Sequence, residues 1–124
     1  MSGPAAGYTA VLCTAERCST DDLRDTAAAL RECVRTSEHG LLVMAGCTVG
    51  ALGCRLRPPG PLLVVQPCDP DRQPVGPAVR VGPVTGPEDV RTIERWMGGQ
   101  QLDPALLPDH LVGLERSTRR AARN

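Results

Sequence analysis

The sequence predicts an α/β fold with a four-stranded mixed sheet, helices packed on that sheet, and a short helical extension at the C-terminus. Three observations carry this prediction. Short apolar runs are typical of strands, two longer segments repeat their apolar residues at helical spacing, and the order of these segments is β-α-β followed by β-β-α. A chain of 124 residues suits one modest hydrophobic core.

The first half of the chain predicts the β-α-β unit. Residues 8–13, "YTAVLC", form a short apolar run typical of a buried strand. Ser19 or Thr20 then precedes a helix over residues 21–36, which opens with acidic side chains and repeats apolar residues at spacings of four, three and four. We expect Gly40 to end this helix in the left-handed conformation. The second strand follows over residues 41–46, "LLVMAG".

The second half predicts the β-β-α unit. Residues 62–67, "LLVVQP", are too apolar for an exposed strand, so we place them in the middle of the sheet. The turn-rich residues 68–77 link them to an antiparallel neighbour within residues 78–84. A second helix opens at Pro87 and ends at Gly98 and Gly99, and its apolar stripe should dock on the sheet.

The C-terminal segment predicts a short helix that starts at Asp103 and Pro104 and breaks at Pro108. It is rich in leucine and ends in an arginine cluster, so we divide the chain into a domain over residues 1–100 and a tail over residues 101–124. The leucines of the tail either close one edge of the domain or dock into a partner or a second copy of the chain, which would form a homodimer.

Composition excludes several classes of function. The 14 basic residues are all arginine, they are balanced by 14 acidic residues, and most are spread along the chain, so no broad positive field for nucleic acid is expected. Tyr8 and Trp96 are the only aromatic residues, which argues against base-stacking platforms. The chain has no run of 18 apolar residues and no secretory pattern, which predicts a cytoplasmic protein without a membrane segment.

Six cysteines point to chemistry, because in a reducing compartment they are more often free thiols or metal ligands than disulfides. Cys13 lies at the exit of the first strand and Cys47 at the exit of the second, whereas Cys18 and Cys54 lie in the loops that follow these strands. Parallel strands end at the same edge of a sheet, so these four thiols can meet there. Four thiolates suit either a [2Fe-2S] cluster or a structural zinc ion. The C-x4-C and C-x6-C spacings leave both open, although the second is longer than a zinc knuckle.

The chain resembles the thioredoxin-like [2Fe-2S] ferredoxins, especially the small actinobacterial ferredoxin-like proteins. The matching segments are "VLCTAERCS", Gly46 with Cys47, the later Cys54, "GPLLVVQP", "VRVGPVTGPEDVRTIERWMGG" and "LDPALLPDHL". The resemblance implies a thioredoxin-like fold and a cluster held by Cys13, Cys18, Cys47 and Cys54. It also implies electron transfer rather than enzymatic catalysis, either as a free carrier with a redox partner protein or as an accessory subunit of a larger oxidoreductase complex.

Two other functions remain open on the residues alone. The chain is alternatively a zinc-stabilised or cofactor-free interaction module in a multiprotein assembly, or a thiol redox protein that uses Cys47 with Cys54, or Cys13 with Cys18. Cys68 is kept as a reserve ligand, although we expect it at the opposite end of its strand from the four-cysteine loops.

The remaining candidate groups favour structural roles. Cys33 lies on the first helix and is interpreted as a packing residue. His39 and His110 are expected to be exposed or capping, because no spacing joins them to a catalytic triad. The paired acidic residues at 21, 22, 88 and 89 lie at helix starts, where they favour the helix dipole rather than paired-carboxylate catalysis.

Overall fold

The computed structural model describes residues 7–14, 21–46, 60–99 and 102–112. Its elements are β1 (Gly7–Cys13), α1 (Asp22–Thr36), β2 (Gly40–Ala45), β3 (Leu63–Cys68), β4 (Val79–Val81), α3 (Pro87–Gly98) and the 3-10 turns η2 (Pro104–Leu106) and η3 (Asp109–Leu111). This order matches the predicted β-α-β and β-β-α units.

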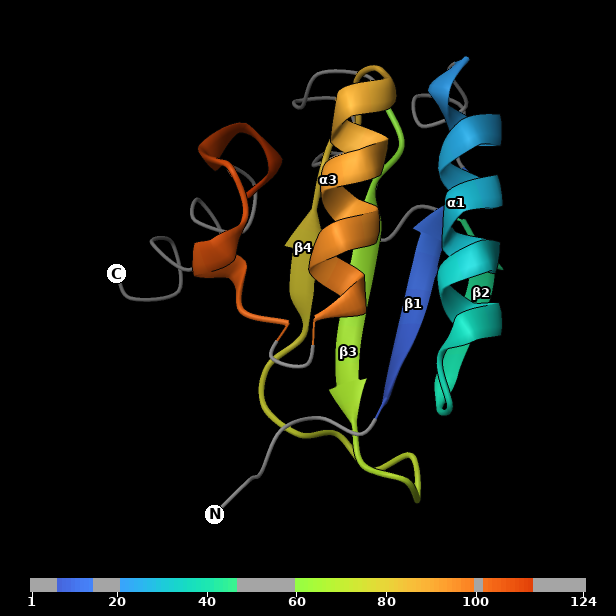
Figure 1. Cartoon of the computed structure of the whole chain (residues 1–124), viewed down its shortest axis with the longest axis vertical. Coiled ribbons are helices and arrows are strands. Elements are labelled where there is room, and N and C mark those ends of the chain that lie inside the picture. The colour runs from blue at the N-terminus through green and yellow to red at the C-terminus, as the bar shows by residue number, and fades with distance from the viewer. Residues whose placement is uncertain (1–6, 15–20, 47–59, 100–101, 113–124) are drawn as a thin grey trace.

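The four strands form one mixed sheet in the order β2-β1-β3-β4 (Figure 1). β1 runs parallel to β2, whereas β3 is antiparallel to both β1 and β4. The predictions that β3 lies inside the sheet and that β4 is its antiparallel neighbour are therefore confirmed. β4 is only three residues long, shorter than the segment from which it was predicted.

The core lies between one face of the sheet and the two helices, which both cover that face in Figure 1. Alternation along β1 directs Tyr8, Ala10 and Leu12 to this face, and each is at most 3% exposed. The fully buried Leu30 of α1 alone contributes about 1.5–3 kcal/mol through burial. Helix α3 adds four buried apolar residues: Val90, Ile93, Trp96 and Met97. The predicted amphipathic faces of both helices are thus the buried ones.

The connection from α1 to β2 differs from the prediction. Ser37 caps the helix in an extended conformation with φ −96° and ψ 140°, and Gly40 is already the first residue of β2. The expected left-handed ending at Gly40 is therefore wrong. A Cβ atom at Gly40 would lie 3.0 Å from Cβ of Ser37 and 3.1 Å from Cε2 of Tyr8, so close packing is what favours glycine at this position.

The described part of the C-terminal segment packs on the same core. The predicted short helix is instead two 3-10 turns on either side of Pro108, as the proline interrupts the backbone hydrogen-bond pattern. Nε1 of Trp96 donates to the carbonyl of Asp103 over 2.8 Å, and the amide of Gly82 donates to the carbonyl of Leu111 over 2.8 Å. Buried apolar side chains complete this contact: Leu102, Leu107, Leu111 and Val112.

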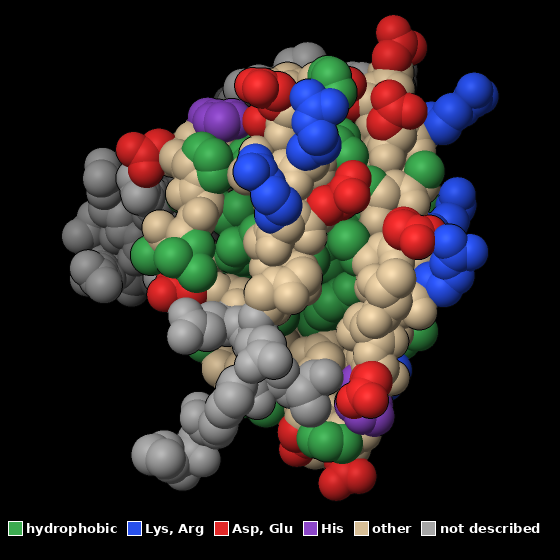
Figure 2. Space-filling view, in the orientation of Figure 1, with side chains coloured by type: hydrophobic (Ala, Val, Ile, Leu, Met, Phe, Trp, Pro, Cys, Tyr) green, Lys and Arg blue, Asp and Glu red, His purple; other side chains and the backbone are tan. Residues whose placement is uncertain are grey.

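Charged side chains of both signs are interspersed over the helix-covered face (Figure 2). This pattern agrees with the balanced composition and leaves no large field of one sign on that face. Within the described residues, neither helix has the length and apolar character needed to cross a lipid bilayer.

Candidate functional site

The carboxyl ends of β1 and β2 lie side by side. Cys13 is the register partner of Ala45, and Thr14 binds the carbonyl of Ala45 twice, with its backbone amide and its hydroxyl each 2.7 Å from that oxygen. The chain therefore leaves both strands at the same edge of the sheet. Cys47 follows Ala45 by two residues in the sequence. The predicted convergence of the two strand exits is confirmed.

Cys13 is fully buried at this edge. Leu12 faces the helices, so the alternation of the strand directs Cys13 toward the opposite face of the sheet. Its backbone amide donates to the carbonyl of Leu62 over 2.9 Å, which anchors the end of β1 to the chain entering β3.

The other three predicted ligands, Cys18, Cys47 and Cys54, lie outside the described residues. In the ranges that the structure describes, no group of three or more His, Cys, Asp or Glu side chains is arranged to hold a metal ion. Cys13 is thus the member of the predicted ligand set whose place in the fold is known.

Cys68 ends β3, where its register partner is Gly7 at the start of β1. Gly7 and Cys13 are separated by six residue steps of about 3.3 Å, so Cys68 lies on the order of 20 Å from Cys13. Its Sγ lies 3.3 Å from the carbonyl oxygen of Gln66 and 3.8 Å from Oγ1 of Thr9. The expected position at the opposite end of the strand is confirmed, and Cys68 cannot share a site with Cys13.

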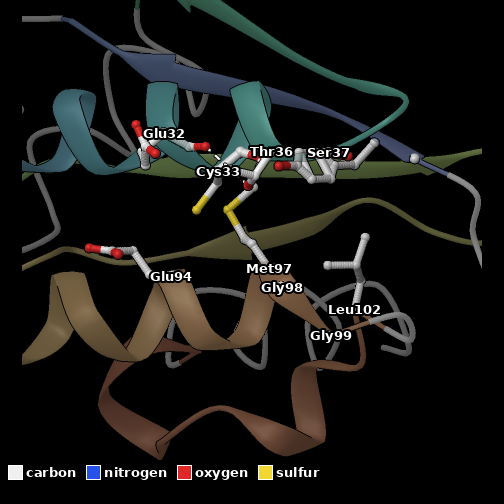
Figure 3. Close-up of a pocket in the computed structure, with 11 residues that line it drawn as sticks. Glu32, Cys33, Thr36, Ser37, Glu94, Met97, Gly98, Gly99 and Leu102 are labelled. Atoms are coloured by element: carbon white, nitrogen blue, oxygen red, sulfur yellow. Dashed lines mark hydrogen bonds between the residues drawn. The ribbon is translucent and has the colours of Figure 1, made fainter.

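A cavity of about 370 Å³ lies beside Cys33, between the C-terminal halves of α1 and α3. Figure 3 shows that Cys33 and Met97 extend from the two facing helices into the space between them. Tyr8, Ser37 and Glu94 also line the cavity. Its volume is at the lower end of the range for small-molecule sites. Cys33 packs against the core as predicted, and it also lines this cavity.

The pKa values of the thiol and of the phenol that line the cavity are both raised. Desolvation, reinforced by the negative charges of Glu94 and Glu32, raises the pKa of the Cys33 thiol. Desolvation and the neighbouring Cys33 raise the pKa of Tyr8 to about 12, although a hydrogen bond with Ser37 opposes the shift. A protonated thiol is a poor nucleophile, so Cys33 is not activated for catalysis.

A buried carboxylate at the start of α3 connects the helix to η3. One oxygen of Asp89 lies 2.7 Å from Nε2 of His110, and the other accepts the amide of Thr85 at 3.0 Å and its hydroxyl at 3.1 Å. Desolvation alone would raise the pKa of Asp89, but these hydrogen bonds and the nearby imidazole lower it overall. Asp89 thus anchors the C-terminal segment in addition to opening the helix.

The Asp89–His110 contact and the Cys33 cavity are the two features that sequence reasoning missed. Asp89 and His110 are 21 residues apart, and no local pattern joins them. The one available signal was "TGPED", in which Thr85 lies four residues before the acidic residue at the third helical position, one residue more than in a capping box. His39 contributes its backbone carbonyl, which accepts the amide of Tyr8 and Nη1 of Arg72, both over 3.1 Å.

The chain matches no protein-family model, no curated protein and no solved structure with which it was compared.

Proposed function

We propose that the protein is a thioredoxin-like electron carrier that binds a [2Fe-2S] cluster where β1 and β2 end. The observation that carries the proposal is the double contact of Thr14 with the carbonyl of Ala45, which holds the two strand exits together. A cysteine ends the first of these strands and another follows the second by two residues. Two cysteine-bearing loops that start from one edge suit a ligand set of four thiolates.

The arrangement of the elements supports a thioredoxin-like assignment. A parallel β-α-β unit is followed by an antiparallel hairpin and a helix on the same mixed sheet. The two described helices, α1 and α3, lie on one face of that sheet (Figure 1). This topology is consistent with the element order of the thioredoxin-like core.

The residues fit such a cluster in their chemistry. Cys13 would supply one thiolate, and Cys18, Cys47 and Cys54 would supply the other three. The cluster would provide one-electron redox chemistry. Cys13 is fully buried, and burial around a ligand restricts solvent access and so tunes the reduction potential. The protein itself would hold the cluster and present it to a redox partner, either as a free carrier or within a larger complex.

The test is anaerobic purification of the full chain, followed by measurement of iron and acid-labile sulfide. We expect both in equal amounts, with visible absorption that bleaches on reduction. Cys13→Ser and Cys54→Ser should each lose the cluster. Cys33→Ser and Cys68→Ser are matched controls that should retain it, because Cys33 lies on α1 and Cys68 lies at the far end of the sheet.

Circular dichroism of each variant separates loss of the cluster from loss of the fold. Stoichiometric zinc without iron would overturn the proposal in favour of a zinc-stabilised module. Absence of iron and sulfide after anaerobic reconstitution, together with a disulfide that forms reversibly, would overturn it in favour of a thiol redox protein.

A further inference from the structure

We propose that the free edge of β2 pairs with β2 of a second copy of this chain. In the resulting homodimer, the two strands run antiparallel about a twofold axis at Leu42 and join the sheets into one. This proposal does not depend on the nature of the site at Cys13. It rests on the composition of β2, on the direction of its backbone groups and on the register that they allow.

β2 is an edge strand of the described sheet, and its own sequence lacks the features that normally protect an edge. It stands first in the strand order, and the sequence of Gly40–Ala45, "GLLVMA", contains no charge and no proline. Leu41, Val43 and Met44 are each about two-fifths exposed, at 42%, 40% and 43%. Long apolar edges of this kind pair readily with another strand.

The strand at the opposite edge of the sheet, β4, has the protective features that β2 lacks. β4 is three residues long, carries Arg80 at its centre, and is followed by Gly82 and Pro83. Short length, charge and proline are three common ways in which proteins prevent edge pairing. Of the two edge strands that the structure describes, β4 thus carries these protective features and β2 carries neither charge nor proline.

Hydrogen bonds to β1 establish which backbone groups of β2 face outward. The carbonyl of His39 accepts the amide of Tyr8, and the carbonyl of Ala45 accepts the amide of Thr14. Residues at odd-numbered positions of β2 therefore direct their backbone N–H and C=O groups toward β1. Because direction alternates along a strand, Gly40, Leu42 and Met44 direct their N–H and C=O groups to the free edge. In the described part of the chain, no strand pairs with that edge.

A twofold axis at Leu42 uses all of these groups. Leu42 then lies opposite Leu42 of the partner subunit, and Gly40 lies opposite Met44 of the partner subunit. Residues that face each other in this way exchange both N–H···O=C bonds. A register centred on Val43 would instead place Gly40 opposite Gly46 of the partner subunit, which lies beyond the end of β2, so the axis at Leu42 is favoured.

The same register brings exposed apolar side chains together. Leu41 lies across from Val43 of the partner subunit on the face of the sheet away from the helices, and the symmetry repeats this contact. Both side chains lose exposed surface, and no charge within β2 is desolvated. The strand is thus complementary to itself, which is why we assign the partner as a second copy.

Sedimentation velocity of the full chain over a wide concentration range tests the proposal. We expect a monomer–dimer equilibrium in the wild type. Leu41→Lys and Val43→Glu each introduce one unpaired charge per subunit, and therefore two at the interface of the dimer. The dissociation constant of each variant dimer should therefore rise by roughly a hundredfold or more. Both positions are exposed, so the variants should fold, as circular dichroism will show. Leu106→Lys, at a site 66% exposed in η2, should dimerise like the wild type.

Mixing the two charged variants tests the register itself. In the mixed dimer, the lysine introduced at position 41 of one chain faces the glutamate introduced at position 43 of the other. The second Leu41–Val43 contact keeps its native residues, so mixing should restore dimers. A monomeric wild type, undiminished dimers in either single variant, or a mixture that stays monomeric would each overturn the proposal.

Discussion

The carboxylate of Asp89 allows a quantitative test of how the C-terminal segment is attached. Its two oxygens bind the amide and hydroxyl of Thr85 at 3.0 and 3.1 Å and Nε2 of His110 at 2.7 Å. The perturbation is Asp89→Ala, which removes all three contacts. Because Thr85 and His110 are themselves exposed, their freed groups can bind water, and the loss is smaller than for three buried hydrogen bonds.

The expected magnitude has two parts. Loss of a side-chain acceptor at a helix N-terminus costs about 1 kcal/mol. The contact with His110, whose side chain is 58% exposed while that of Asp89 is 9% exposed, adds up to about 1 kcal/mol. We therefore expect Asp89→Ala to lower the free energy of unfolding by about 1–2 kcal/mol at pH 7. At ~4 °C per kcal/mol for a chain of this length, the midpoint of thermal unfolding should fall by about 4–8 °C.

Urea unfolding followed by circular dichroism measures this difference. The matched control is Glu88→Ala, the same kind of change one residue earlier in the first turn of α3, at an exposed position. This control accounts for the gain in helix propensity and the loss of charge near the helix dipole. It should change the free energy of unfolding by less than about 0.5 kcal/mol.

The pH dependence gives the sharper result. The pKa of Asp89 is lowered in the folded protein, so its stabilising contribution is complete above the unfolded value of about 3.9. That contribution disappears as the pH falls through the folded pKa, because the carboxyl must then be protonated. The gap between wild type and Asp89→Ala should shrink below about pH 4. The reasoning would be refuted if Asp89→Ala lost no more free energy of unfolding than Glu88→Ala. It would also be refuted if the difference between wild type and Asp89→Ala were the same in acid as at pH 7.

Two further predictions concern the core and the cavity. Leu111→Ala should lower the free energy of unfolding by about 2–5 kcal/mol, because Leu111 is fully buried. The control Leu106→Ala, at a position 66% exposed, should lower it by less than about 0.5 kcal/mol. Equal losses for the two variants in urea unfolding would contradict the packing of Leu111. Glu94→Gln should lower the pKa of Cys33 and speed its alkylation at pH 8, as followed by peptide mass mapping, because a negative charge beside the thiol is removed. Glu88→Gln is the control for this second experiment, and an equal alkylation rate in both variants would contradict the assigned cause.

Local patterns in the sequence were sufficient to predict the order of the elements. The spacing of Leu23, Ala27, Leu30 and Val34 predicted α1, because a helix turns through 3.6 residues and places them on one face. The continuous apolar run at residues 62–67 predicted an interior strand. The prediction that Cys13 and Cys68 lie at opposite ends of the sheet followed from strand direction alone, and the structure confirms it.

Contacts between distant residues were not predictable in the same way. Gly40 was assigned a left-handed conformation from its place after a helix, but its close approach to Tyr8 and Ser37 is the contact that favours glycine. The Asp89–His110 contact and the cavity at Cys33 each join segments that are far apart in the chain. No local periodicity encodes such pairs, since they form only when separate elements pack together.

By itself, the sequence determined the α/β class, the two amphipathic helices, the antiparallel hairpin and the placement of Cys13 at the end of a strand. These properties depend on the alternation of apolar and polar residues over a few turns or strand repeats. Only the tertiary structure decided that residues 102–112 pack on the core, that the carboxylate of Asp89 contacts His110, and that no described strand pairs with the outer edge of β2. Each of these outcomes depends on which elements become neighbours, and that is established by packing across the whole sheet rather than by any single segment.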